Sequence, residues 1–175
     1  MLNPLLLIKL VILKTGLFFI LFIFAFKQGN TQQDTSALFK RFPVVPPFSL
    51  MKTDSGWITK DGLKKNHPLI IMYFSPGCHH CVDQMEDMLK RKNDFNEIQI
   101  LLATYQPLEE LRAFEQKYKL YDYPNIQSGR DTKYFLQPFY RIRNLPYLAL
   151  YDKKGKLVTT FEGNVKVDQL VGAFK

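Results

Sequence analysis

The chain has 175 residues, of which 46% are hydrophobic and 14% aromatic, enough for one globular domain with its own core plus additional segments. Its formal net charge is +8. The basic residues are spread along the chain and form no run interleaved with aromatic residues. The charge therefore indicates solvated surface and a membrane flank, and argues against a nucleic-acid-binding protein.

Residues 1–27 predict a targeting or membrane segment. Residues 15–26 carry no charge, a length that suits the apolar part of a signal peptide and is short for a spanning helix. If the segment starts at Leu10 and the Lys14 side chain reaches the membrane–water interface, the segment is nearly long enough to span a bilayer. No small-residue cleavage site and no lipid-anchoring cysteine follow, so an uncleaved signal anchor is favoured over a cleaved signal peptide. The positive charge before it predicts a cytoplasmic N-terminus and an exported remainder.

Residues 28–45 predict a linker, and residues 46–175 a globular domain. The linker begins with a polar stretch that is poor in hydrophobic residues. Prolines interrupt regular structure at its end and just beyond it (Pro43, Pro46, Pro47). Early in the domain, residues 48–51 predict a short strand. His67 precedes a proline and is expected in a surface loop rather than in a role as ligand or base.

The only two cysteines of the chain lie in one short stretch, Cys78-His79-His80-Cys81. Residues 69–74 before it are apolar or aromatic and predict a buried strand, and the Ser-Pro-Gly sequence of residues 75–77 predicts a turn. After it, apolar residues recur at helical spacing (Val82, Met85, Leu89). The pattern predicts a buried strand that leads into a helix, with both cysteines at the helix N-terminus.

This placement predicts thiol–disulfide chemistry. A helix N-terminus has unpaired N–H groups and the positive end of the dipole, which favour a thiolate at Cys78. Cys81 lies one helical turn further on, so its sulfur can reach Cys78 and form a redox-active Cys78–Cys81 disulfide. We expect Cys78 to attack a partner disulfide and Cys81 to resolve the mixed disulfide. His79 and His80 lie between them and are expected to tune the thiolate.

A structural disulfide and a metal site are the alternatives for this pair. A disulfide that closes so short a loop gains little stability. A structural zinc site needs four ligands, yet the chain has no second cysteine pair, and adjacent histidines point in different directions on a helix. Redox chemistry is favoured over a structural disulfide, and a structural disulfide over a metal. No metal and no cofactor beyond the cysteine pair are expected.

The rest of the chain predicts an α/β fold. Residues 97–104 predict a second buried strand, and a helix is expected to start at Pro107. This order of strands and helices predicts a right-handed crossover and a partly parallel sheet. Residues 121–144 are rich in aromatic residues and are expected to cover the sheet rather than to cap the active site. The domain ends with a third strand, its hairpin partner and a closing helix (145–152, 157–161, 167–174).

The order of elements resembles that of the thioredoxin superfamily, and is most similar to its membrane-anchored, extracytoplasmic TlpA-like or ResA-like branch. The resemblance covers roughly residues 46–175 and rests on three features (residues 74–81; Leu145-Pro146 before a strand; residues 152–155 before a strand and Gly163). It implies a thioredoxin-like fold, with a central mixed sheet flanked by helices. It also implies that the bond before Pro146 is cis, and that Leu145 and Pro146 position a substrate chain as an added strand.

Some positions depart from the pattern of these relatives. Gly77 stands where many of them have a tryptophan before the first cysteine. Met72 stands where thioredoxin proper has a buried aspartate, so that proton acceptor is missing. Asp83 and Glu86 lie near the glutamate of some ResA-like proteins without matching it, and solvation of the helix surface is the simpler role for both. Either one of the two intervening histidines or water is then expected to accept the proton of the cysteine pair.

The sequence therefore predicts a thiol–disulfide oxidoreductase that is membrane-anchored through residues 1–27, with its domain on the extracytoplasmic (periplasmic) side. Its expected partners are client proteins with thiols or disulfides and a membrane or exported redox partner. A secreted or periplasmic protein after signal cleavage is the alternative location. The alternative function is a thioredoxin-like module that binds and delivers copper through the two thiolates and a histidine. A peroxidase and a tethered interaction domain rank lower, and the direction of electron flow is open.

Overall fold

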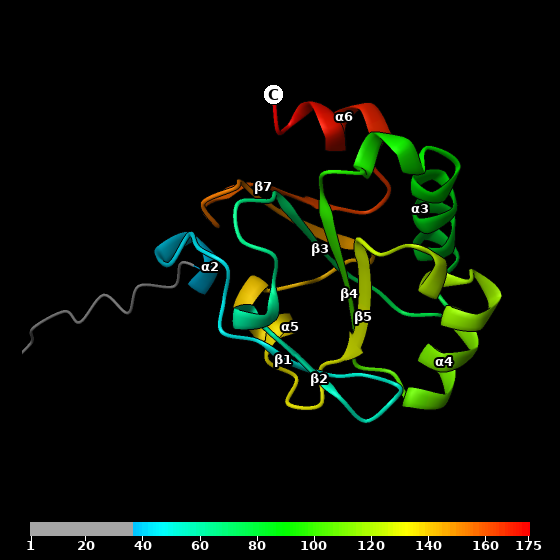
Figure 1. Ribbon diagram of the computed structural model, residues 1–175. Coiled ribbons are helices and arrows are strands. Elements are labelled where there is room, and N and C mark those ends of the chain that lie inside the picture. Colours follow the sequence, from blue (N-terminus) through cyan, green and yellow to red (C-terminus); the bar gives the residue numbers. More distant parts are fainter. Residues whose placement is uncertain (1–36) are drawn as a thin grey trace, which may run out of the picture. The chain divides into compact units, whose positions relative to one another are not determined.

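The structure is a computed structural model that describes residues 37–175 (Figure 1). The predicted signal anchor at residues 1–27 and most of the predicted linker lie outside the described residues. The described residues form one compact unit. Within residues 37–175, no helix is both long and apolar enough to cross a membrane.

Strands and helices alternate through most of this unit, as the sequence predicts for an α/β fold. The strands are β1 (Ser49–Met51), β2 (Trp57–Thr59), β3 (Leu69–Tyr73), β4 (Gln99–Thr104), β5 (Ile126–Arg130), β6 (Tyr147–Tyr151) and β7 (Leu157–Glu162). The α-helices are α2 (Leu38–Arg41), α3 (His79–Lys90), α4 (Leu108–Lys117), α5 (Leu136–Tyr140) and α6 (Val167–Gly172). Three short 3₁₀ helices are η1 (Lys60–Gly62), η2 (Lys92–Phe95) and η3 (Leu120–Asp122).

The strands form one mixed sheet in the order β2-β1-β5-β4-β3-β6-β7. Strands β3, β4 and β5 are parallel to one another, whereas β6 runs antiparallel to β3 and β7 antiparallel to β6. Helices α3 and α4 lie on one side of the sheet, and α2 and α5 on the other (Figure 1). The mixed sheet flanked by helices confirms the predicted thioredoxin-like fold.

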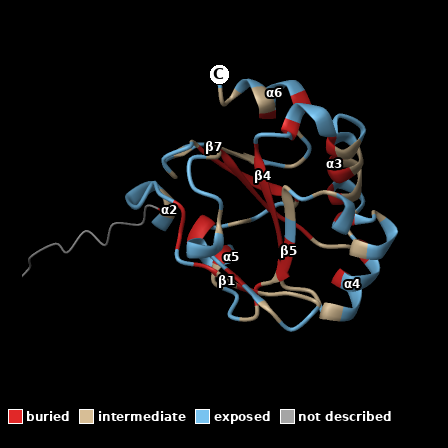
Figure 2. Ribbon diagram, viewed as in Figure 1, coloured by how far each residue is buried: buried red, intermediate tan, exposed pale blue. Residues whose placement is uncertain are grey.

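Each face of the sheet has its own hydrophobic core, and strands β3, β4 and β6 are buried throughout (Figure 2). All five side chains of β3 are buried: Ile70 and Met72 enter the core under α3 and α4, and the alternate residues enter the core under α5. Helices on both faces explain why β3 is a continuous apolar run rather than an alternating pattern. Because the unit holds a complete sheet and both cores, we expect residues 37–175 to fold without the residues before them.

The aromatic segment at residues 121–144 contains a strand that the sequence pattern does not predict. Strand β5 pairs with β4 along its length and with β1 at Met51 and Arg130. Its sequence, Ile-Gln-Ser-Gly-Arg, contains one good strand former, so its conformation depends on its neighbours rather than on its composition. After β5, α5 contributes Leu136, Phe139 and Tyr140 to the core, so this part of the segment covers the sheet as predicted.

The close approach of β1 to β5 depends on Gly129. A Cβ atom at this position would lie 2.7 Å from the Cβ of Leu50. We expect Gly129→Ala to lower the free energy of unfolding by about 1–3 kcal/mol, because the strands must separate to admit the methyl group. Chemical denaturation of residues 37–175 measures this change. Gly62→Ala, where no atom lies within 4 Å of the new Cβ, is the matched control, and an equal loss there would contradict the packing explanation.

The last residues of the predicted linker lie on the domain rather than extending from it. Val45 is buried, and its N–H donates to the carbonyl oxygen of Gly155 at 3.0 Å. Val44 forms an isolated bridge with Lys156. The chain therefore enters the domain beside the turn between β6 and β7.

Candidate active site

The two cysteines lie where the sequence places them, at the start of the helix that follows β3. The Cys78 N–H donates to the Ser75 carbonyl oxygen at 3.0 Å, which closes the turn after the strand. The Cys78 carbonyl oxygen accepts from the N–H of Val82 at 3.0 Å, the first turn of α3. Cys78 is therefore the N-cap residue of α3, and Cys81 lies within its first turn.

The two sulfurs have unequal environments. Cys78 is half-buried, whereas Cys81 is fully buried in the core under α3. Burial, together with a hydrogen bond to the Cys78 side chain, raises the pKa of Cys81 to about 12. Of the two residues, Cys78 is the one an incoming disulfide can reach, and Cys81 holds its proton at neutral pH.

This inequality predicts selective alkylation of the reduced protein. At pH 7 we expect iodoacetamide to modify Cys78 at least about tenfold faster than Cys81, because the buried thiol is both inaccessible and protonated. Below its pKa, the thiolate fraction of Cys81 rises about tenfold for each pH unit, so its modification in a Cys78→Ser variant should accelerate toward alkaline pH. Peptide mass mapping over time measures both rates. Equal rates at pH 7 would show that the two thiols do not have different roles.

The two histidines point to solvent and have separate partners. The His79 side chain is 84% exposed, and its Nε2 lies 3.4 Å from the Asp83 carboxylate one turn along α3. The carbonyl oxygen of His80 accepts from the Asn164 side chain. The rings are tilted, with centroids 6.0 Å apart. Across the part of the chain that the structure describes, no three His, Cys, Asp or Glu side chains are grouped to hold a metal ion.

Among residues 37–175, the one buried carboxylate is that of Asp131, which lies near Tyr73 and the core on the other face of the sheet from Cys81. Met72, which replaces the aspartate of thioredoxin proper, is fully buried in the same core as Cys81. The Glu86 carboxylate accepts a hydrogen bond from the Tyr118 hydroxyl at 3.0 Å. The buried polar residue of α3 is Gln84, whose amide bonds the backbone of Val165 in both directions and joins the helix to the segment before α6.

Leu145 and Pro146 lie at the same end of the sheet as the cysteine loop. Tyr147, the next residue, pairs with Tyr73 at the end of β3. The bond between Leu145 and Pro146 is cis, as the family resemblance implies. Leu145 packs against the same core as Cys78. The Pro146 carbonyl oxygen accepts from the Gly163 N–H, but the Leu145 backbone makes no hydrogen bond within residues 37–175.

A group of tyrosines beside the cysteine loop is not predicted by the sequence analysis. Tyr105, after β4, lies between Tyr73 and Tyr134, with ring centroids 6.4 and 6.1 Å away. The neighbouring Gln106 amide donates to the Ser75 hydroxyl, which joins this group to the turn before Cys78. Tyr134 is 52% exposed and has a left-handed backbone. The end of β3 and two separate loops supply these rings, so no local pattern could reveal the group.

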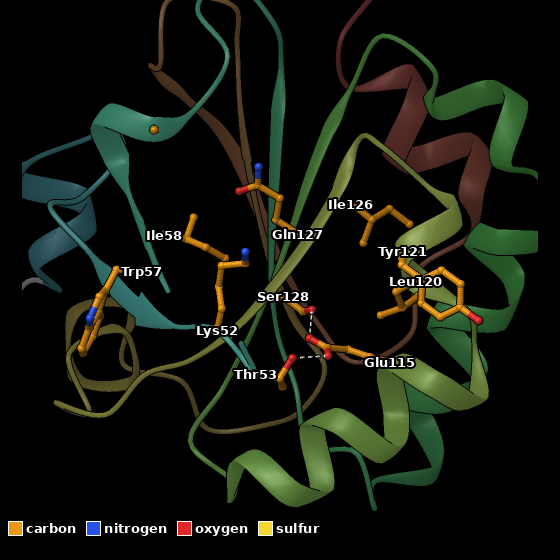
Figure 3. Close-up of a pocket in the computed structure, with 11 residues that line it drawn as sticks. Lys52, Thr53, Trp57, Ile58, Glu115, Leu120, Tyr121, Ile126, Gln127 and Ser128 are labelled. Atoms are coloured by element: carbon orange, nitrogen blue, oxygen red, sulfur yellow. Dashed lines mark hydrogen bonds between the residues drawn. The ribbon is translucent and has the colours of Figure 1, made fainter. Parts of the chain in front are cut away.

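A cavity of about 460 Å³ lies at the other edge of the sheet, beside β5 (Figure 3). At its floor the Glu115 carboxylate accepts hydrogen bonds from the hydroxyls of Thr53 and Ser128, each at 2.6 Å. These bonds join α4 to β5 and to the loop after β1. No predicted site residue lines the cavity.

A mixed sheet whose inner strand leads into a helix that begins with Cys-x-x-Cys, with a cis-proline at the same end of the sheet, is the arrangement of thioredoxin-like proteins. The chain belongs to the family of thioredoxin-like domains, whose model matches residues 59–175. No curated protein matches the chain.

Several solved structures share the fold. A secreted disulfide oxidoreductase of Mycobacterium tuberculosis, homologous to E. coli DsbE, is 15% identical and has a TM-score of 0.60, over 73% of this chain and 93% of that one. StoA from Bacillus subtilis is 18% identical with a TM-score of 0.58, over 75% of this chain and 98% of that one. The exposed lipoprotein thioredoxin Etrx1 of Streptococcus pneumoniae is 23% identical with a TM-score of 0.56, over 73% of this chain and 98% of that one.

Proposed function

We propose that the protein is a thiol–disulfide oxidoreductase that exchanges disulfides with client proteins through Cys78 and Cys81. The observation that carries this proposal is the unequal burial of two sulfurs in the first turn of one helix. An exchange enzyme needs one sulfur that clients can reach and a second that only the first can reach. Cys78 and Cys81 meet these two requirements. The solved structures with the same fold include disulfide oxidoreductases, which supports the same class of reaction.

The exchange proceeds in two displacements. The Cys78 thiolate attacks one sulfur of a client disulfide, so a Cys78–client bond forms and the other client sulfur leaves as a thiolate. Cys81 then loses its proton and attacks the Cys78 sulfur. The Cys78–Cys81 disulfide forms, and the client leaves as a dithiol. In the reverse direction the protein oxidises the client, and the redox partner that regenerates it sets the direction.

Within residues 37–175, no buried carboxylate lies on the Cys81 side of the sheet, so we expect the acceptor of its proton to come from the loop side. Water that reaches Cys78, and the exposed imidazoles of His79 and His80, are the available acceptors. The positive end of the α3 dipole lies at Cys78, where negative charge accumulates during the exchange. We assign the two histidines a tuning role and no covalent one.

The free Leu145 backbone offers a hydrogen-bonding edge to the client. Its N–H and carbonyl oxygen have no bond in the described chain, and they lie at the sheet end that holds Cys78. A client segment can therefore pair there as a short added strand, with Pro146 beneath it. This arrangement would bring the client sulfur to Cys78.

The exposed ring of Tyr134 is expected to contact side chains that flank the client cysteine. Tyr134→Ala should lower kcat/KM about three- to tenfold for a peptide disulfide with an aromatic neighbour, since one ring contact is lost. Reduction of glutathione disulfide, which has no such side chain, should not change. Tyr121→Ala is the matched control, because this tyrosine is 74% exposed but lies at the distant cavity. An equal loss with glutathione disulfide would mean that Tyr134 supports the fold and not the client.

We also propose that the domain works outside the cytoplasm, anchored by residues 1–27, as in the TlpA-like or ResA-like branch. The uncharged run at residues 15–26 and the positive charge before it support export. Two proteins with the same fold, a secreted oxidoreductase and an exposed lipoprotein, support this location. A membrane or exported protein would then exchange electrons with the Cys78–Cys81 pair. A protein released after signal cleavage is the alternative.

The reduction potential of Cys78–Cys81 in residues 37–175 tests the activity. Equilibration with thiol buffers gives the fraction oxidised, read by alkylation and mass. A potential near or below about −250 mV would indicate a reductant of clients, and one above about −150 mV an oxidant. If no Cys78–Cys81 disulfide equilibrates with the buffer, the proposed activity is wrong.

A further inference from the structure

A strongly basic depression lies at the end of the sheet opposite the cysteines. It has a volume of about 590 Å³ and is lined by residues around the starts of β3 and β4 and by the turn between β6 and β7. Leu69, at its edge, begins the strand that ends near the cysteine loop. Five lysines line it, and all of them are exposed (Lys60, Lys64, Lys65, Lys153, Lys154).

The charge of these lysines is weakly compensated. Two carboxylates, Asp61 and Asp152, line the same depression. One oxygen of Asp152 already accepts the backbone N–H groups of Lys154 and Lys156. None of the five ammonium groups forms an ion pair with a carboxylate in residues 37–175, whereas Lys52 and Lys90 elsewhere do. The depression therefore presents an excess of positive charge to solvent.

The chain enters the domain at this depression. Val44 and Val45, shortly after the first described residue, line it. The short stretch that includes α2 also exposes apolar side chains: Leu38 is 42%, Phe42 56% and Val44 48% exposed. Of these three, Val44 lines the depression itself, so an exposed apolar side chain lies among the lysines. A membrane interface accepts exposed apolar side chains among its acyl chains and attracts lysines, so it matches this combination.

We propose that this basic face docks on an anionic phospholipid surface. The proposal rests on the proposed membrane anchor, because residues 28–36 can extend at most about 30 Å and would keep the domain close to the bilayer. Docked in this way, the domain presents its opposite end, with Cys78, to clients away from the membrane. The bilayer surface thus acts as the partner that orients the active site.

Vesicle sedimentation of residues 37–175 tests the docking without the anchor. We expect binding to vesicles of phosphatidylcholine that contain phosphatidylglycerol, and little binding to phosphatidylcholine alone. A variant with glutamate at four lining positions should bind more than about tenfold more weakly (Lys64→Glu, Lys65→Glu, Lys153→Glu, Lys154→Glu). A control with the same net charge, changed at exposed lysines outside the depression, should lose less than about threefold (Lys119→Glu, Lys133→Glu, Lys166→Glu, Lys175→Glu).

Each other outcome would overturn the proposal. No binding of the wild-type domain, or equal losses in the two variants, would show that no docking face exists beyond the net charge. Release from vesicles by inorganic phosphate, but not by chloride of equal ionic strength, would assign the depression to a free phosphate ion. Exchange with glutathione in both variants should equal that of the wild type. The glutathione assay therefore tests the oxidoreductase proposal, and the vesicle assay tests docking independently of it.

Discussion

Cys78→Ser is expected to abolish disulfide exchange, whereas Cys81→Ser is expected to trap clients. Without the reachable sulfur, no mixed disulfide forms, and exchange should fall by at least about 10³-fold, to the background level. Without the buried sulfur, the first displacement still occurs, but the Cys78–client bond has no resolving thiol. The two variants therefore differ in more than lost activity: Cys78→Ser should form no mixed disulfide, and Cys81→Ser should accumulate it.

Insulin reduction measures the first effect, and non-reducing electrophoresis with mass spectrometry identifies the trapped clients. Both variants should unfold at nearly the wild-type denaturant concentration, because serine is close to cysteine in size. If Cys78→Ser trapped clients and Cys81→Ser did not, the assigned roles would be reversed. Full exchange by Cys78→Ser would instead support a tethered interaction domain with an incidental cysteine pair.

Asp131→Ala is expected to cause the largest loss of stability among single polar substitutions. The Asp131 carboxylate is 1% exposed, and its two oxygens accept the N–H groups of Phe135 and Leu136 at the start of α5. Its removal leaves one buried and one partly buried N–H group without partners, which costs about 3 kcal/mol. Its charge is also a cause, after burial, of the raised pKa of Tyr73, so the carboxylate lies near the end of β3.

Asp152→Ala is the matched control for this effect. Its carboxylate also accepts two backbone N–H groups, those of Lys154 and Lys156, but these donors lie in an exposed turn. Water can replace the lost bonds there, so we expect a loss of about 1 kcal/mol. Denaturant unfolding of both variants measures the difference. Equal losses would show that burial of the donors does not set the cost.

The position of the two cysteines was predictable from one local stretch. A continuous apolar strand, a Ser-Pro-Gly turn and a helical repeat place Cys78 at a helix N-terminus, and the structure has this arrangement. Cys81 follows at one turn by helix geometry alone. Strand β4 and helix α4 were predictable for the same reason, because their apolar pattern is carried by residues close together in the chain.

The elements that depend on distant neighbours were not predictable in this way. Strand β5 has little intrinsic preference for its conformation and is held by β4 and β1. The tyrosine group beside the cysteines comes from the end of β3 and two loops, which meet only at the end of the sheet.

By itself, the sequence determined the thioredoxin-like class of the domain, the order of the main elements and the position of the two cysteines at a helix start, because hydrophobic periodicity and turn residues act over a few positions. The family resemblance added the cis bond before Pro146. Only the tertiary structure decided which sulfur is buried, where Leu145 leaves its backbone open, and that the lysines gather at the far end of the sheet. Burial and electrostatic surroundings are properties of contacts between segments far apart in the chain, and these exist only once the sheet has formed.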